Sequence, residues 1–100
     1  MYAIVFSQRA KEDIAKLRRD EPNAHKKLVK LVNELMDHPR TGTGHPEQLT
    51  GDRAGQWSRK ITKKHRLIYE IFGAEVHVDV ISAWGHYGDK SALKWNKFSG

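Results

Sequence analysis

The 100-residue sequence contains no cysteine, which excludes disulfide bridges, cysteine-ligated zinc sites and thiol nucleophiles. No apolar run approaches the roughly 18 residues that a membrane-spanning helix needs. The first residues lack the pattern of a secretory signal peptide. We therefore expect a small cytoplasmic protein with no membrane association.

What the sequence does contain is a normal globular balance, with 38% hydrophobic and 30% charged residues. Lysine and arginine number 18 against 12 acidic residues, which gives a formal net charge of +6. Much of this excess lies between positions 53 and 66, where six basic residues occur and no acidic one. They are Arg53, Arg59, Lys60, Lys63, Lys64 and Arg66. Such a local basic stretch indicates an anionic partner, of which nucleic acid is the leading candidate.

The first 40 residues predict a strand followed by two helices. Residues 2–6 form an apolar run of strand length, and Ser7 behind it is a good helix N-cap. Apolar residues then recur at helical spacing, and Pro22 suits the first turn of a second helix that Pro39 ends. We expect the two helices to form an antiparallel hairpin.

The second half predicts a long loop and three strands. Residues 40–55 are rich in glycine, and Leu49 is their clear apolar anchor. A loop of this length in a small domain is often functional. Residues 56–62, 66–72 and 76–80 then follow as strand-like segments.

The order β-α-α-β-β-β predicts an α+β domain in which the helical hairpin packs on a mainly antiparallel sheet. In the first of the three later strands, alternation places Trp57, Arg59 and Ile61 on one face. We assign residues 1–87 to this domain. Residues 88–100 form a C-terminal tail that could dock on the domain or on an interface.

Three ionisable residues stand at the ends of elements or in the loop: Glu47, Arg66 and His86. Together they supply what metal-free RNA cleavage requires. A carboxylate can remove the 2′-OH proton, a guanidinium can offset charge on the phosphoryl oxygens, and an imidazolium can protonate the leaving 5′ oxygen. The histidines show no metal-ligand spacing, and no nucleotide-binding fingerprint is present. We therefore expect no metal and no cofactor.

Several motifs fall in order along the chain and carry a resemblance to a known family. They are Gly44-His45-Pro46-Glu47-Gln48-Leu49, Gly55-Gln56-Trp57-Ser58-Arg59-Lys60-Ile61-Thr62, His65-Arg66-Leu67-Ile68-Tyr69 and His86-Tyr87, supported by Val32-Asn33-Glu34-Leu35 and His38-Pro39. With them, nearly all of residues 2–87 resembles the Txe/YoeB branch of the RelE toxin superfamily. Members of that branch are ribosome-dependent messenger-RNA endonucleases of toxin–antitoxin modules.

The resemblance implies a microbial-ribonuclease-like fold and a role for each matching residue. Glu47 matches the general base, Arg66 the phosphate-binding arginine and His86 the general acid. Arg59 matches an arginine that contacts the messenger backbone, and Tyr87 matches an aromatic residue beside the catalytic histidine. The other basic residues, Lys60, Lys63, Lys64 and Arg53, would steer the protein onto RNA.

The resemblance also implies partners, namely the 70S ribosome with messenger RNA in its A site and a YefM-like antitoxin. Family members often form homodimers, so a second copy of the chain is a further expected partner. Two features depart from the family pattern. Thr50 stands where the family often has a basic residue, and residues 88–100 continue past the point at which related chains tend to stop.

Two other functions fit the same scaffold, because fold alone does not decide function. A non-catalytic nucleic-acid-binding protein or co-repressor would keep the basic stretch but would not need Glu47 or His86. A relative of the gyrase-inhibiting toxins of this superfamily would damage DNA, and that branch is not expected to combine Glu47, Arg66 and His86. The substitution Glu47→Gln separates a nuclease from a pure binder.

Overall fold

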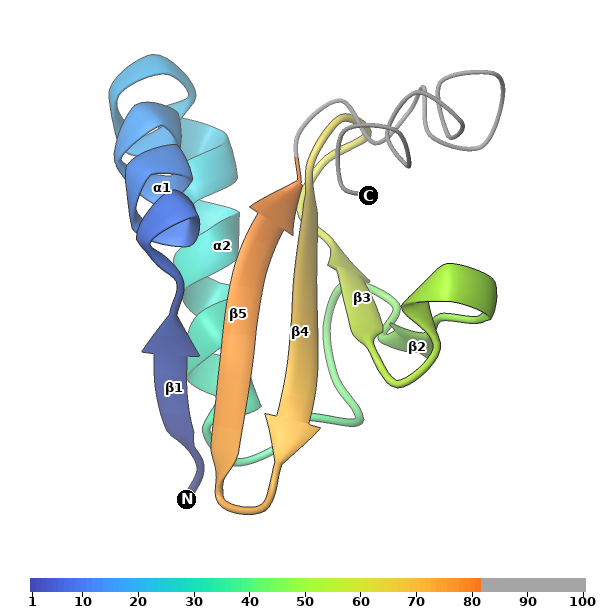
Figure 1. Ribbon diagram of the computed structural model, residues 1–100. Helices are drawn as coiled ribbons and strands as arrows, with labels where there is room; N and C mark the ends of the chain where they lie inside the picture. Colours follow the sequence, from blue (N-terminus) through green and yellow to red (C-terminus); the bar gives the residue numbers. More distant parts are fainter. Residues whose placement is uncertain (82–100) are drawn as a thin grey trace.

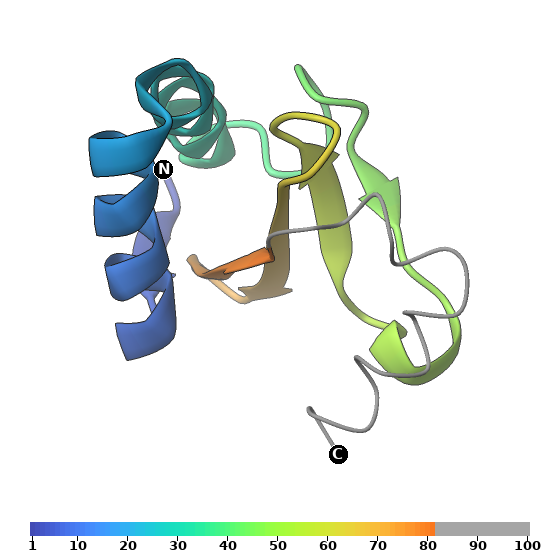
Figure 2. The same cartoon turned by 90° about the horizontal axis from the view of Figure 1, so that it is seen from above.

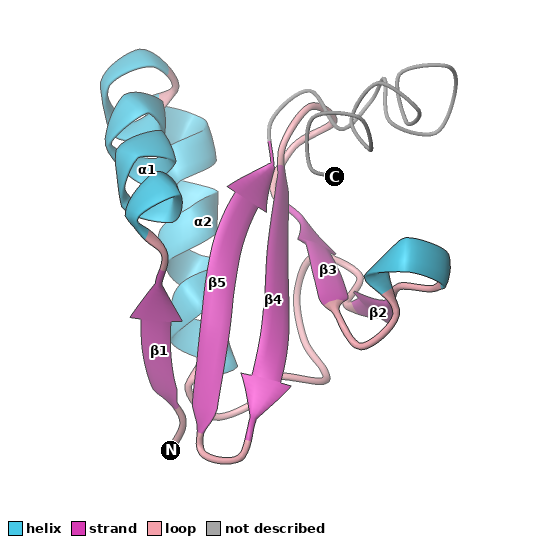
Figure 3. Ribbon diagram, in the orientation of Figure 1, coloured by secondary structure: helices cyan, strands magenta, loops and turns pink. Residues whose placement is uncertain are grey.

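The computed structural model describes residues 1–81, which form two helices and one five-stranded sheet. In chain order the elements are β1 (Ala3–Phe6), α1 (Gln8–Asp20), α2 (Pro22–Leu35), β2 (Glu47–Gln48), the 3-10 turn η1 (Gly51–Arg53), β3 (Trp57–Lys60), β4 (Arg66–Phe72) and β5 (Glu75–Ile81). The sheet order is β1-β5-β4-β3-β2 (Figure 3). Among the strand pairs of residues 1–81, only β1–β5 is parallel, which confirms the predicted α+β class with a mainly antiparallel sheet.

The loop expected over residues 40–55 holds two elements that the sequence did not predict. Glu47–Gln48 pairs with β3 as a two-residue strand, and η1 follows it. A strand this short carries no alternating pattern, and the glycines around it read as loop. The tail expected at residues 88–100, with His86 and Tyr87 before it, lies outside the described residues, so the domain division stays a prediction.

The helices form where the sequence placed them, and they cover one face of the sheet (Figures 1 and 2). The side-chain oxygen of Ser7 accepts a hydrogen bond from the backbone N–H of Ala10 at 3.0 Å, which caps α1. Pro22 opens α2, and this helix stops at Leu35 rather than continuing to Pro39. In the described part of the chain, neither helix is long and apolar enough to cross a membrane.

The core lies between the helices and one face of the sheet. Leu28, Leu31 and Leu35 recur along α2 and are buried against alternate residues of β4 and β5, such as Leu67 and Val78. Full burial of each such side chain contributes roughly 1.5–3 kcal/mol. This packing fixes which residues of the central strands point away from the helices.

The opposite face of the sheet carries Glu47 of β2, Ser58 and Lys60 of β3, and Arg66 of β4. Because residues that pair across two strands share a face, the register places Glu47 beside Ser58, and Lys60 beside Arg66. Arg59 alternates with Ser58 and Lys60, so it points to the core face. The sheet therefore brings Glu47 and Arg66 together, although they are far apart in sequence.

Candidate active site

Glu47 and Arg66 lie on the sheet face that the helices leave open. Nη1 of Arg66 is 3.7 Å from Oε1 of Glu47, and the same nitrogen donates a hydrogen bond to Oγ of Ser58 at 3.1 Å. The side chain of Glu47 is 58% exposed and that of Arg66 is 18% exposed. A reachable carboxylate thus stands beside a guanidinium that its surroundings hold in place.

This pair can act on a hydroxyl group and on the phosphate group next to it. An exposed carboxylate can accept a proton from a hydroxyl, and a fixed guanidinium can bind the phosphate oxygens next to that hydroxyl. Ser58, which sequence reasoning did not select, accepts the hydrogen bond that orients the guanidinium. Its only sequence signal is the period-2 alternation that puts it on the same face as Glu47.

Three of the basic residues expected to bind RNA are exposed near the Arg66 end of the sheet. Lys60 pairs with Arg66 across β3 and β4, and Lys63 and Lys64 stand in the turn that joins these strands. Arg53 is half-buried in η1, where its Nη1 donates to Oε1 of Gln56 at 2.7 Å. The structure therefore gathers positive charge at one end of the Glu47–Arg66 face.

The turn that carries these lysines is tied to the helices through His65, which sequence reasoning also did not select. His65 is buried, and its Nε2 is 2.9 Å from Oε2 of Glu21, the residue between the helices. Oγ1 of Thr62 accepts hydrogen bonds from the backbone N–H groups of Lys64 and His65 at 3.2 Å each. The His65–Glu21 contact and the hydrogen bonds to Thr62 together hold the start of β4, where Arg66 lies.

Arg59 is placed differently from the expectation that it contacts the messenger. Its side chain is wholly buried on the core face. Nη2 donates to the carbonyl oxygens of His38 and Thr41 at 2.5 and 2.7 Å, Nη1 to Oε1 of Glu34 at 2.9 Å, and Nε to the Tyr69 hydroxyl at 3.1 Å. Because its donors are engaged inside the fold, we correct its assignment from an RNA-binding residue to an internal one.

The environment of this cluster shifts two pKa values. Burial works to raise the pKa of Glu34, but hydrogen bonds from Thr43 and the charge of Arg59 outweigh it, so that pKa lies below the ordinary 4.5. Burial raises the pKa of Tyr69 above its ordinary 10.0, although Arg59 acts in the opposite direction. Glu34 is therefore charged and Tyr69 neutral at neutral pH.

Two of the predicted site residues come after Ile81, the last residue that the structure describes. His86 and Tyr87 lie outside the described residues, so the general acid stays a prediction. Within residues 1–81, no group of three or more histidine, aspartate or glutamate side chains is arranged to hold a metal ion. The described half of the site thus consists of Glu47, Arg66 and Ser58.

Comparison with known proteins gives consistent results. A family model described as "YoeB-like toxin of bacterial type II toxin-antitoxin system" matches residues 6–87. Toxin RelK of Mycobacterium tuberculosis is 32% identical over 87 residues, which cover 87% of this chain and 100% of that protein.

Solved structures of similar toxins share the fold. The YoeB/ParE toxin from Agrobacterium tumefaciens superposes with a TM-score of 0.75 at 30% identity, over 80% of this chain and 96% of that one. A YoeB–YefM complex from Staphylococcus aureus gives a TM-score of 0.72 at 26% identity, over 82% and 95% of the two chains. A YoeB dimer from the same organism gives 0.71 at 27% identity, over 81% and 94%.

Proposed function

The chain belongs to the family of YoeB-like toxins of bacterial type II toxin–antitoxin systems, and from that premise we propose that it is an endoribonuclease that cuts messenger RNA in the ribosomal A site. The observation that carries the proposal is the 3.7 Å approach of the Glu47 carboxylate to the Arg66 guanidinium on the sheet face that the helices do not cover. Positive charge from Lys60, Lys63 and Lys64 at one end of that face favours an RNA ligand.

The proposed reaction is a transesterification. Glu47 takes the proton of a ribose 2′-OH, and the resulting oxygen attacks the adjacent phosphorus. Arg66 stabilises the negative charge that builds on the phosphoryl oxygens. The bond to the 5′ oxygen breaks, and that oxygen takes a proton from His86. The products are a 2′,3′-cyclic phosphate and a free 5′-OH, and no step requires a metal ion.

The proposed partners follow from the same premise. The relative from Staphylococcus aureus forms a complex with YefM, which supports neutralisation of this chain by a YefM-like antitoxin. Dimers are known for the same relative, which supports a homodimer. The ribosome would hold the messenger bent into line for attack, because alignment of the reacting atoms supplies much of the rate.

The test is primer extension on a messenger in a purified translation system, with wild-type protein, Glu47→Gln and Glu75→Gln. Glu75 is an exposed glutamate at the far end of the sheet and serves as the matched control. We expect discrete cuts at A-site codons with the wild type and Glu75→Gln, and none with Glu47→Gln. Cuts that persist in Glu47→Gln would remove Glu47 as the base. Ribosome binding without any cuts, even by the wild type, would favour a non-catalytic binder or co-repressor.

A further inference from the structure

We propose that Arg59 is a positioning residue for the cleavage site, acting from inside the fold on the loop that leads to Glu47. This inference rests on the proposed function, since it assigns Glu47 the role of base. Arg59 does not touch the substrate face. It acts through residues 38–44, the segment that connects the end of α2 to β2.

The first observation is that Arg59 binds the backbone of this loop at several points. Nη2 donates to the carbonyl oxygens of His38 and Thr41 at 2.5 and 2.7 Å, and Nη1 approaches that of Thr43 at 3.4 Å. These carbonyls lie outside any helix or strand. A planar guanidinium with five N–H donors can satisfy all of them at once, which a lysine ammonium cannot do.

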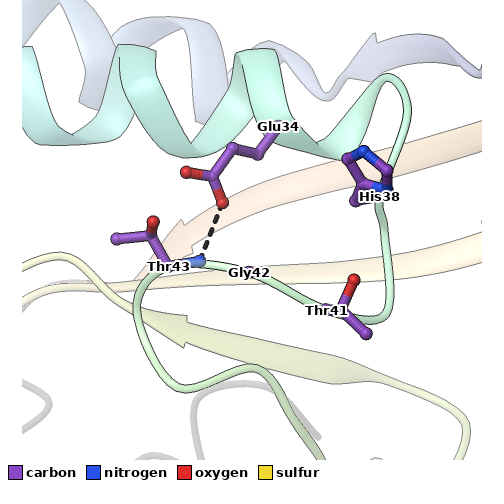
Figure 4. A pocket seen from close by; sticks show the side chains of 5 residues that line it. All are labelled: Glu34, His38, Thr41, Gly42 and Thr43. Atoms are coloured by element: carbon purple, nitrogen blue, oxygen red, sulfur yellow. Dashed lines mark hydrogen bonds between the residues drawn. The ribbon is translucent and has the colours of Figure 1, made fainter.

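The second observation is that two neighbours of Arg59 hold the same loop. Oε1 of Glu34 accepts from Nη1 of Arg59 and also from the backbone N–H of Thr43, at 2.8 Å (Figure 4). The hydroxyl of Tyr69 accepts from Nε of Arg59 and donates to the carbonyl oxygen of Pro39 at 2.7 Å. The loop is thus held at both ends by groups that Arg59 itself orients.

The third observation is that, at Gly42 and Gly44, the loop backbone lies too close to its neighbours to carry a side chain. Gly42 has a φ of +123°, and a Cβ there would meet Oε1 of Glu34 and lie 3.2 Å from Nη1 of Arg59. Gly44 has a φ of +85°, and a Cβ there would lie 3.0 Å from the carbonyl oxygen of Lys60. The same Gly44 accepts a hydrogen bond from the backbone N–H of Lys60 at 2.7 Å. The chain is therefore pressed against β3 just before β2 begins.

The consequence for the site follows from the alternation of β3. Arg59 points inward and holds the loop, while its neighbour Ser58 points outward, pairs with Glu47 and contacts Arg66. Glu47 belongs to a strand of only two residues, so the incoming loop has a large share in fixing its position. A displacement of about 1 Å in a catalytic group can lower a reaction rate about 100-fold.

The experiment compares Arg59→Lys, Tyr69→Phe and Glu34→Gln with the wild type. The control is Leu17→Ala, a buried residue of α1 on the far side of the core, whose loss of stability is measured by urea unfolding. Three quantities are measured on the full chain: the single-turnover cleavage rate at saturating ribosome, the affinity for the ribosome, and backbone amide exchange over residues 40–48. Conditions are chosen so that each variant is folded.

We expect Arg59→Lys to lower the cleavage rate about 10- to 100-fold and to leave ribosome affinity within about twofold. Amide exchange should quicken over residues 40–48 and not over β4 and β5. Tyr69→Phe and Glu34→Gln should give smaller changes of the same kind, so the test survives if Arg59→Lys does not fold. Leu17→Ala should leave both the cleavage rate of the folded protein and the exchange of residues 40–48 unchanged.

Two results would overturn the inference. One is unchanged exchange over residues 40–48 in all three variants, since Arg59 would then not be what holds the loop. The other is faster exchange with an unchanged cleavage rate, since the loop would then not set the position of Glu47. Failure of the proposed function is distinguishable, because in that case the wild type itself does not cut, while the exchange measurement still decides whether Arg59 holds the loop.

Discussion

The proposed stabilisation of the phosphoryl oxygens by Arg66 depends on the planar shape of the guanidinium as well as on its positive charge. Its Nη1 donates a hydrogen bond to Oγ of Ser58 and lies 3.7 Å from Oε1 of Glu47, so the planar group is held in one orientation beside the proposed base. Lysine at this position would offer one ammonium group in place of a planar fork. We expect Arg66→Lys to lower the cleavage rate about 100- to 1,000-fold, as for loss of a transition-state donor.

The measurement for Arg66 is single-turnover cleavage in the same translation system. Arg9→Lys, at an exposed position on α1, is the matched control and should cleave at the wild-type rate. A rate for Arg66→Lys equal to that of the control would mean that Arg66 supplies only general positive charge.

Among single residues, the sequence singled out Glu47 and Arg66, which the sheet brings together, and it assigned to Arg59 an RNA contact that the burial of its side chain contradicts. Alternation put Arg59 on the same face as Trp57 and Ile61, yet the family resemblance implied a contact with the messenger backbone. Its burial depends on Glu34, which lies 25 residues earlier in the chain, and on backbone carbonyls of the loop. No local pattern carries information about such distant partners.

At the scale of elements, the link between α2 and the loop should be sensitive to acid. The pKa of Glu34 is lower in the folded protein than the ordinary 4.5. Its carboxylate therefore contributes stability that is complete above about pH 4.5 and is lost as pH falls towards the folded pKa. We expect Glu34→Gln to reduce the free energy of unfolding near neutral pH and to flatten its decline on acidification.

Urea unfolding of the wild type and Glu34→Gln at a series of pH values from about 7 down to about 3 tests this expectation. Glu12→Gln, at an exposed position on α1, is the control and should retain the wild-type profile. If the free energy of unfolding falls with pH in the same way in the wild type and in Glu34→Gln, then carboxylates other than Glu34 cause the loss of stability in acid.

The loop itself should be intolerant of a side chain at Gly42. Alanine there would adopt a φ near +123° and push its Cβ into the Glu34–Arg59 pair, so part of that pair would have to separate. We expect Gly42→Ala to lower the free energy of unfolding by about 2–3 kcal/mol. Gly73→Ala, in the β4–β5 turn with a φ of +58° and no neighbour near a Cβ, should cost about 1 kcal/mol.

Urea unfolding of the two alanine variants decides this comparison. Equal losses would show that backbone conformation alone limits Gly42, and that the Glu34–Arg59 pair moves aside at no cost.

Elements with long periodic patterns were predictable, and the short ones were not. The stripe of leucines on α2 and the alternation in β4 and β5 reflect burial on one face, which the sequence records residue by residue. β2 exists because Glu47 and Gln48 pair with β3 in the folded protein. Two residues are too few to show an alternating pattern that would predict this pairing from the sequence. The site depends on that strand, so the least predictable element is the one that carries the proposed base.

At the scale of the whole molecule, the sheet separates two kinds of surface. The helices cover one face (Figure 2). The strand register places Glu47, Arg66 and Lys60 on the other, and Lys63 and Lys64 are exposed in the turn that joins β3 and β4. The predicted order β-α-α-β-β-β was sufficient to place the hairpin on one side. It did not give the parallel pairing of β1 with β5, which joins the two ends of the described chain.

This separation of surfaces predicts where RNA binds. Each lysine that contacts one phosphate of a single-stranded RNA contributes about −0.7 to the slope of log affinity against log salt concentration. We expect replacement of Lys60, Lys63 and Lys64 by alanine to make the slope less negative by up to about 2. Replacement of Lys11 and Lys16, which are exposed on α1, should leave the slope unchanged.

The measurement is a salt titration of binding to a short single-stranded RNA, made with Glu47→Gln in every protein so that no cleavage occurs. Because the net charge falls by three in one variant and by two in the other, a mere effect of total charge would change both slopes in about that ratio. If RNA binds on the Glu47–Arg66 face, only the slope of the variant without Lys60, Lys63 and Lys64 changes. Equal or proportional changes would therefore place the RNA elsewhere and would remove the lysines of the β3–β4 turn from the binding surface.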